Sequence, residues 1–150
     1  MRLLILRAAT SGRPYISGKK GDQKMITGID HVHLMCGDVE KMVQYFERVF
    51  EGKVESRAEV RGFPMVRLFA YGVPVNIMGA DPKAGTLVAG KGSRGLDHFG
   101  FAVKDLEKTV EDLKKKGAQF SIGPSTTATG VKYAFIEGPE GIRIELVDRG

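Results

Sequence analysis

The sequence predicts an α+β fold in which one βαβββ unit occurs twice and the two copies curve around a shared ligand site. Residues 30–43 recur, altered but recognisable, as residues 97–110, with matched positions 67 residues apart. Residues 72–78 match residues 141–147 at a spacing of 69. Internal repeats of this kind indicate one structural module used more than once.

The first copy spans about residues 26–79. A short half-apolar run at residues 28–36 predicts a strand, and Asp38 is expected to cap a helix that runs to about Phe50. Apolar residues at three- and four-residue steps give this helix one buried face. Gly52 is expected to end the helix in a left-handed conformation. Three strands should follow, at residues 53–60, 64–70 and 73–78.

The second copy spans about residues 95–148. It is expected to contain a strand at 96–103, a helix capped by Asp105 and closed by Gly117, and strands at 119–122, 131–136 and 142–147. One such unit cannot bury both faces of its sheet. Two units together can form a barrel-like enclosure with the helices outside. A ligand site would then lie in its concave mouth.

Composition and charge narrow the functional classes. The chain has 150 residues, 42% of them apolar, and no apolar run long enough for a transmembrane helix. A single cysteine, Cys36, excludes an intrachain disulfide and favours a reducing, cytoplasmic location. All of the net charge of +5 comes from residues 1–24, which hold six basic residues and one acidic residue. The repeated part is therefore close to neutral, and we expect neither a nucleic-acid nor a membrane partner.

The basic segment at residues 1–25 is expected to be a flexible extension of a single domain at residues 26–150. Gly, Ser, Pro and Lys are frequent in it, and its apolar start is too short for a secretory signal. Two alternatives remain open. It resembles an organelle presequence in composition, or translation starts at Met25.

Two histidines at equivalent repeat positions suggest a metal site. If a pseudo-twofold axis relates the copies, His31 and His98 become neighbours, and Glu145 on the last strand approaches the same point. Two imidazoles and one carboxylate leave open positions on a divalent metal, as in non-haem iron oxygenases. The simpler interpretation of Glu145 is a salt bridge to Arg143 or Arg67.

His33 has no counterpart in the second copy, where Gly100 stands in its place. The repeat itself therefore does not require this histidine. It is expected to be a general base, a substrate contact, a partner of a metal ligand, or an ordinary surface imidazole. Cys36 is expected to be a small buried residue rather than a nucleophile.

Three motifs resemble the vicinal oxygen chelate superfamily, also called the glyoxalase, bleomycin resistance protein and extradiol dioxygenase family. They are Ile-Asp-His-Val-His-Leu at 29–34, Leu-Asp-His-Phe-Gly-Phe at 96–101, and Phe-Ile-Glu-Gly-Pro-Glu-Gly at 135–141. The resemblance implies a glyoxalase-like curved sheet, a homodimer, a small-molecule substrate, and one divalent metal (Fe, Ni, Zn, Co or Mn). It makes His31, His98 and Glu145 the metal ligands.

The resemblance also marks a departure. A fourth ligand position, Glu or Gln in glyoxalase I, falls on Asn76, which is at best a weak ligand or substrate contact. Tyr133 and Arg143 are further candidate substrate contacts, with Arg67 and Lys132 as other cations near the mouth.

The resemblance implies three functions. The first is a metal-dependent, glyoxalase I-like lyase or isomerase that passes through an enediolate-type intermediate, with Glu145 or His33 moving the proton. The second is a non-haem Fe(II) extradiol-type dioxygenase. The third is a metal-free binding protein of the bleomycin resistance kind.

Overall fold

The two halves of the chain fold into the same five-element unit. The computed structural model describes residues 28–85 and 94–150, and contacts group His31–Gly150 into one unit. The first half contains β1 (Val32–Cys36), α1 (Val39–Phe50), β2 (Lys53–Val60), β3 (Phe63–Ala70) and β4 (Val73–Gly79). The second contains β5 (Phe99–Ala102), α2 (Leu106–Lys115), β6 (Gln119–Thr126), β7 (Lys132–Glu137), the short 3₁₀ turn η1 (Pro139–Gly141) and β8 (Arg143–Asp148).

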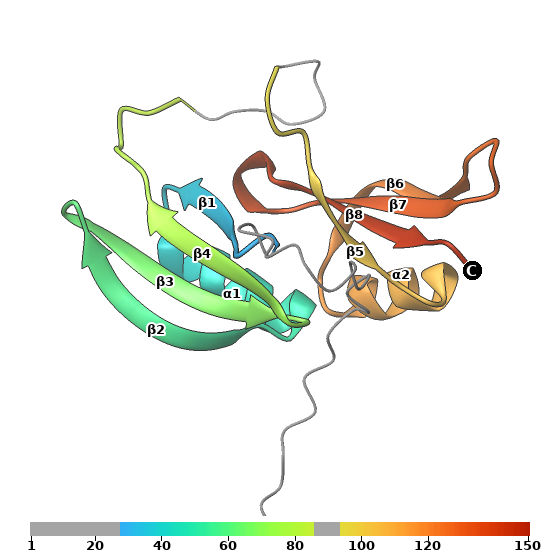
Figure 1. The fold of residues 1–150 in the computed structure, drawn as a ribbon, viewed down its shortest axis with the longest axis horizontal. Coiled ribbons are helices and arrows are strands. Elements are labelled where there is room, and N and C mark those ends of the chain that lie inside the picture. Colours follow the sequence, from blue (N-terminus) through green and yellow to red (C-terminus); the bar gives the residue numbers. More distant parts are fainter. Residues whose placement is uncertain (1–27, 86–93) are drawn as a thin grey trace, which may run out of the picture. The chain divides into compact units, whose positions relative to one another are not determined.

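The two sheets have the same strand order. In the described residues the first sheet is ordered β1-β4-β3-β2 and the second β5-β8-β7-β6 (Figure 1). In each sheet the first strand pairs in parallel with the last, and the remaining pairs are antiparallel. The predicted α+β fold with two βαβββ copies is therefore confirmed. The expected N-terminal extension lies outside the described residues. So do residues 86–93, which make up most of the linker between the two copies.

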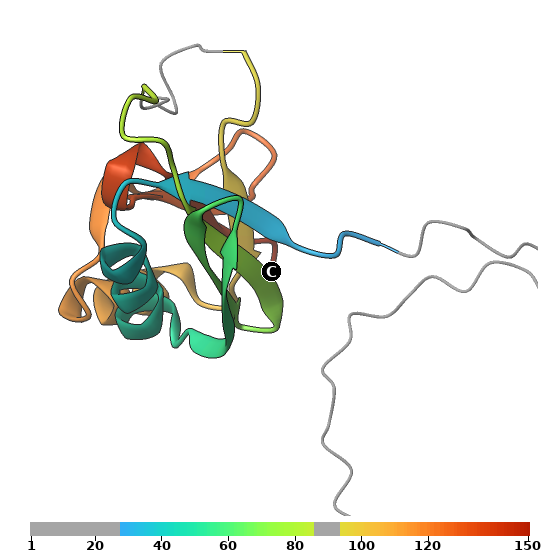
Figure 2. The same ribbon diagram turned by 90° about the vertical axis from the view of Figure 1, so that its left-hand side faces the viewer.

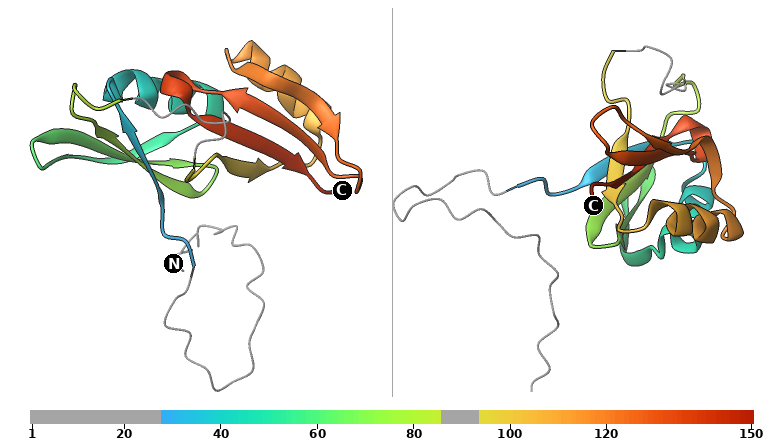
Figure 3. Two further views of the ribbon diagram at one scale, coloured as in Figure 1. Left: turned by 90° about the horizontal axis from the view of Figure 1, so that it is seen from above. Right: turned by 90° about the vertical axis from the view of Figure 1, so that its right-hand side faces the viewer.

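Both helices lie on the same side of the sheets (Figures 2 and 3). The apolar stripe of α1, which includes Met42, Phe46 and Val49, is fully buried, and α2 buries Leu106, Val110 and Leu113. Burying each such side chain contributes roughly 1.5–3 kcal/mol. The core is continuous across the repeat, since the rings of Phe50 and Phe101 lie 5.1 Å apart. The opposite face of each sheet carries no helix, and the candidate site residues lie on it.

Equivalent aspartates begin the two helices, as predicted. Asp38 accepts a hydrogen bond from the backbone N–H of Lys41 at 3.0 Å, and Asp105 accepts one from that of Lys108 at 3.0 Å. Each bond satisfies a backbone donor that the first turn of a helix leaves unpaired. Gly117 follows the end of α2, as predicted, and has a left-handed φ of 92°.

The predicted role of Gly52 is wrong in detail. Glu51 takes the left-handed conformation, with φ 53°, while the Gly52 N–H donates to the Phe46 carbonyl at 2.9 Å. A Cβ on Gly52 would lie 3.0 Å from the carbonyl carbon and oxygen of Phe46. Glycine is therefore needed here for close approach to the helix end.

The first strand of each copy is shorter than predicted. β1 begins at Val32 and β5 at Phe99, so His31 and His98 each stand one residue before their strand. Val32 pairs with Val75, which places Pro74 opposite His31. Proline has no N–H to extend the ladder, which explains the late start of β1.

Candidate functional site

His98 and Glu145 come together on the helix-free face of the second sheet. Their Nε2 and Oε2 atoms lie 3.4 Å apart, and both side chains are partly exposed. Glu145 pairs with Gly100 on one side and with Phe135 on the other. Side chains alternate along β8, so Ile144 and Leu146 point into the core while Glu145 faces away from it.

The other ring nitrogen of His98 is also engaged. Its Nδ1 lies 2.7 Å from Asp97 Oδ2, and the same oxygen accepts a hydrogen bond from Arg143 Nη1 at 3.0 Å. A neutral imidazole that donates from Nδ1 keeps a lone pair on Nε2. In that tautomer the Nε2 lone pair faces the Glu145 carboxylate, and a cation between the two would bind both.

His31 does not join this pair within the chain. In residues 28–85 and 94–150, no three side chains of the His, Cys, Asp and Glu types gather closely enough to hold a metal ion. His31 is exposed just before β1, and its ring centroid lies 6.1 Å from that of His33. The described residues of one chain therefore do not gather His31, His98 and Glu145 into one group that could hold a metal ion.

The first sheet carries the equivalent row of residues in altered form. His33, Asn76 and Arg67 are direct neighbours on adjacent strands, at the positions that Gly100, Glu145 and Phe135 occupy in the second sheet. Asn76 is buried, and its Oδ1 accepts a hydrogen bond from Arg67 Nη1 at 3.2 Å. Arg67 Nε also donates to Glu55 Oε2 at 2.9 Å. An amide paired with a guanidinium cannot act as a second carboxylate base.

The remaining candidates lie around these two rows. Tyr133 is on the same face as Phe135, with ring centroids 5.9 Å apart. Lys132 forms a surface ion pair with Glu107 at 2.9 Å, so its charge is directed to α2.

Cys36 is almost fully buried, and burial together with the nearby Glu140 and Asp38 carboxylates raises the pKa of its thiol to about 11. A thiol with this pKa stays protonated near neutrality, which makes it a poor nucleophile.

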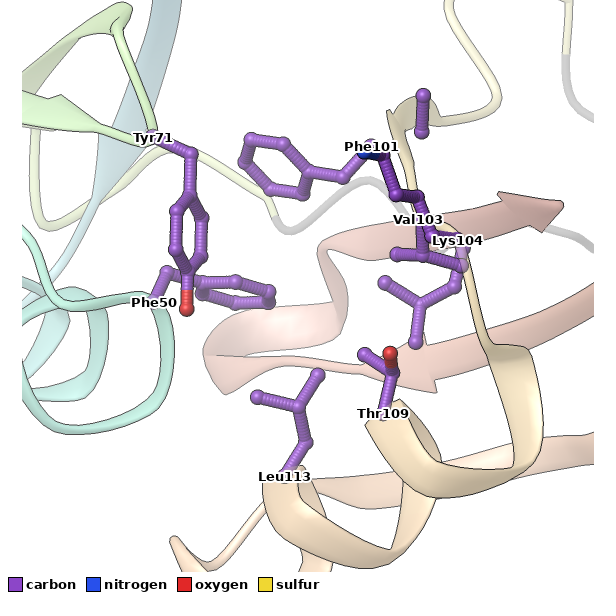
Figure 4. A pocket seen from close by; sticks show the side chains of 9 residues that line it. Phe50, Tyr71, Phe101, Val103, Lys104, Thr109 and Leu113 are labelled. Carbon is purple, nitrogen blue, oxygen red and sulfur yellow. The ribbon is translucent and has the colours of Figure 1, made fainter.

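Two cavities flank these elements. The larger has a volume of about 870 Å³, and its lining includes His33, Asp97, His98, Glu140 and Arg143. The smaller, of about 250 Å³, is bounded by the rings of Phe50, Tyr71 and Phe101 and by side chains of α2 (Figure 4). The described residues lining the smaller cavity include no histidine or carboxylate. The larger cavity is therefore the one in contact with the candidate chemistry.

Asp97 and Glu140 join the site although neither is among the candidate site residues of the sequence analysis. The Asp-His pair occurs in both copies, as Asp30-His31 and Asp97-His98, and this repetition was a usable signal for Asp97. Glu140 carried no such signal, because its contacts depend on the placement of the two halves.

No helix among the described residues has the length and apolarity to cross a membrane.

Comparison with curated proteins finds distant relatives. The chain is 26% identical over 159 residues to a probable chloroplastic lactoylglutathione lyase of Arabidopsis thaliana, covering 95% of this chain and 41% of that protein. It is 25% identical to the uncharacterised protein YwkD of Bacillus subtilis, covering 83% of this chain and 99% of that protein. The chain thus spans about two fifths of the length of the first relative.

Solved structures share the fold. A glyoxalase family protein from Enterococcus faecalis aligns with a TM-score of 0.73 at 18% identity, covering 83% of this chain and all of that one. The fosfomycin resistance protein FosX from Listeria monocytogenes aligns with a TM-score of 0.67 at 16% identity, covering 84% and 96%. A mutant of FosX was solved with manganese(II) and a dihydroxypropylphosphonic acid.

A family model matches residues 28–146, which include every helix and strand described above except the last two residues of β8. Its description is the Glyoxalase/Bleomycin resistance protein/Dioxygenase superfamily. The chain therefore belongs to this superfamily, the vicinal oxygen chelate proteins that the repeated motifs resemble.

Proposed function

We propose that this protein is a metal-dependent enzyme of the glyoxalase I-like lyase or isomerase type, acting on a small oxygenated substrate. The observation that carries the proposal is the 3.4 Å approach of His98 Nε2 to Glu145 Oε2. Two Arabidopsis relatives, the probable chloroplastic lactoylglutathione lyase and a second lactoylglutathione lyase, favour this reaction class. Their identity to this chain is only 25–26%, so the substrate is part of the proposal.

The donor atoms fit a divalent ion. Imidazole nitrogen and carboxylate oxygen suit Fe, Ni, Zn, Co and Mn. Two ligand atoms that each lie about 2.0–2.2 Å from one ion are separated by about 3.0–3.5 Å, and the measured separation lies in this range. Two donors alone make an incomplete site, and His31 is the proposed third ligand.

The chain's own geometry supports a site shared between two copies. His31 is not gathered with His98 and Glu145 among the described residues. β1 and β5, next to which the two histidines stand, are edge strands of their sheets. On β1, Met35 keeps 52% of its surface exposed and shares the outward face with His33. A homodimer that places His31 of one copy beside His98 and Glu145 of the other would complete the site and cover this face.

The proposed division of labour follows from the contacts. A bound divalent metal would supply Lewis-acid stabilisation to two adjacent substrate oxygens. Glu145 would move the substrate proton, because its carboxylate is partly exposed and lies beside His98 on the helix-free face of the sheet. His33 is the alternative base, since it lines the same cavity as His98. Asn76 offers no second carboxylate.

The test is metal analysis followed by an activity assay. Protein purified without added metal or chelator would be analysed for bound elements. It would then be assayed for forming or cleaving lactoylglutathione after loading with each divalent ion. We expect about one ion per chain, and loss of binding and activity in Glu145→Gln but not in Glu111→Gln, which removes an exposed carboxylate of α2. Failure to take up any metal on titration would refute the proposal and favour a metal-free binding protein.

A second candidate is an iron(II) dioxygenase, and Asn76 is the observation that favours it. With Asn76 paired to Arg67, the proposed ligands reduce to two histidines and one glutamate, which is the set used by non-haem iron oxygenases. Oxygen uptake that requires iron and a catechol would select this candidate. Activity with nickel, cobalt, manganese or zinc and no oxygen uptake would exclude it.

A further inference from the structure

The imidazole of His98 is held from two directions by side chains of the second half. Asp97 Oδ2 lies 2.7 Å from its Nδ1. The ring of Phe135 meets it edge to face, with centroids 5.0 Å apart and planes at 85°. The first contact favours a proton on Nδ1, because a carboxylate oxygen can only accept, and the second limits rotation of the ring.

Arg143 connects these two supports. Its Nη1 donates to Asp97 Oδ2 at 3.0 Å, while its guanidinium carbon lies 3.8 Å from the centroid of Phe135. His98, Asp97, Arg143 and Phe135 thus form a closed ring of contacts. We call these four residues the His98 frame. An exposed carboxylate–imidazole pair is weak when isolated, but here the carboxylate is also held by an arginine whose own position is set by stacking.

The frame belongs to the second half only. At the repeat spacing of 69, Arg143 corresponds to Pro74, and the strand register makes Arg67 the counterpart of Phe135. Copy one therefore retains the Asp-His pair, as Asp30-His31, but has neither the arginine nor the aromatic ring at the corresponding positions. The asymmetry indicates a requirement at His98 beyond what the fold imposes on both copies.

We propose that Asp97 and Arg143 are positioning residues that hold His98 in the Nδ1–H tautomer, with the Nε2 lone pair directed at Glu145. This assignment gives Arg143 a role different from the substrate contact expected from the sequence. The purpose of this positioning is to prepare His98 as a metal ligand, and in that respect the proposal rests on the proposed function. Ligand histidines commonly donate their second nitrogen to a carboxylate, and loss of that partner typically weakens metal binding about 10–100-fold.

The first readout needs no metal. Nitrogen-15 NMR of the histidine side chains, in the metal-free protein at alkaline pH, reports the tautomer of each ring. The chain has three histidines, and the signals that disappear in His98→Gln are assigned to His98. We expect the Nδ1–H form for His98 in the wild type, and a mixture of tautomers in Asp97→Ala.

Three further variants separate positioning from general stability. Asp97→Asn keeps an oxygen acceptor and should largely restore the Nδ1–H form. Arg143→Lys keeps the charge but loses the planar stack, and should give an intermediate mixture. Asp112→Ala removes an exposed carboxylate paired with Lys115 on α2 and should leave the tautomer unchanged. A His98 tautomer that is the same in Asp97→Ala as in the wild type would overturn the proposal.

Cobalt(II) titration followed by visible absorption supplies the second readout. Asp97→Ala should bind cobalt about 10–100-fold more weakly than the wild type, with Asp112→Ala unchanged. A wild type that binds no metal, but whose tautomer still depends on Asp97, would refute the proposed function while supporting the positioning role. Equal cobalt affinity in Asp97→Ala and the wild type would overturn the role of Asp97 in preparing a ligand.

Discussion

The carboxylate of Glu140 in the second half caps the end of β1 in the first half by accepting from the backbone of Gly37. The Gly37 N–H lies 2.7 Å and 2.9 Å from the two Glu140 oxygens, and the Asp38 N–H lies 3.1 Å from one of them. Glu140 adopts a left-handed φ of 55° to reach this position. A non-glycine residue in this conformation has a conformational cost that the hydrogen bonds offset.

Glu140→Ala should destabilise the fold by about 1–3 kcal/mol, because two backbone donors lose a charged acceptor. Chemical denaturation measures the effect, and Glu111→Ala serves as the control for loss of an exposed carboxylate. A midpoint equal to that of the wild type would show that water replaces the carboxylate at no cost.

Gly52→Ala should also destabilise the protein, by about 1–3 kcal/mol. The added Cβ would meet the Phe46 carbonyl at 3.0 Å, and backbone atoms of a helix end move little. A Cβ added at Gly123 on β6 would have no atom within 4 Å, so Gly123→Ala is the matched control. Equal thermal midpoints for the two variants would contradict the close approach at Gly52.

Gly100→Val should impair metal uptake and activity while leaving the fold largely intact. A Cβ at Gly100 would stand 3.5 Å from Glu145 Oε2, which is an ordinary contact, but the two further methyl groups of valine would occupy space beside the carboxylate. Gly123→Val, in the same sheet, provides the comparison. Full metal binding in Gly100→Val would mean that the space over Gly100 is not part of the site.

Cys36 should make stability decline in alkaline solution. Burial raises the pKa of its thiol from the usual 9.0 to about 11, so the unfolded chain loses this proton at lower pH than the folded one. The associated stabilisation is present below pH 9.0 and is lost as the pH rises through about 11. Denaturation at a series of pH values should therefore show a flatter decline in this window for Cys36→Ala. Parallel curves for the two proteins would contradict the raised pKa.

Local patterns predicted most of the fold. Asp38 and Asp105 marked both helix starts, and the three-and-four spacing of Met42, Phe46 and Val49 marked a buried face, because these signals act within one or two turns. The start of β1 could not be predicted in this way because it depends on Pro74, a residue of the partner strand. The role of Gly52 could not be predicted locally either. Glu51 takes the left-handed conformation, and glycine is needed at position 52 because a Cβ there would lie 3.0 Å from the Phe46 carbonyl.

The candidate site was only partly accessible to sequence reasoning. The repeat placed His98 and Glu145 on adjacent strands of one sheet, where register brings them together. It could not place His31 relative to them, because that depends on how the two sheets, or two copies of the chain, associate. The charge of Arg143 is visible in the sequence and suggests a substrate contact, whereas its stacking on Phe135 is visible only in the structure.

The most direct test of the central claim is complementation between His31→Ala and His98→Ala. Each variant alone should bind no catalytic metal and show no activity. Mixed, dissociated and reassembled, they should recover about one quarter of the wild-type metal and activity, since random pairing gives one intact site per heterodimer. No recovery from a mixture shown to contain heterodimers would contradict a site built from His31 of one copy and His98 and Glu145 of another.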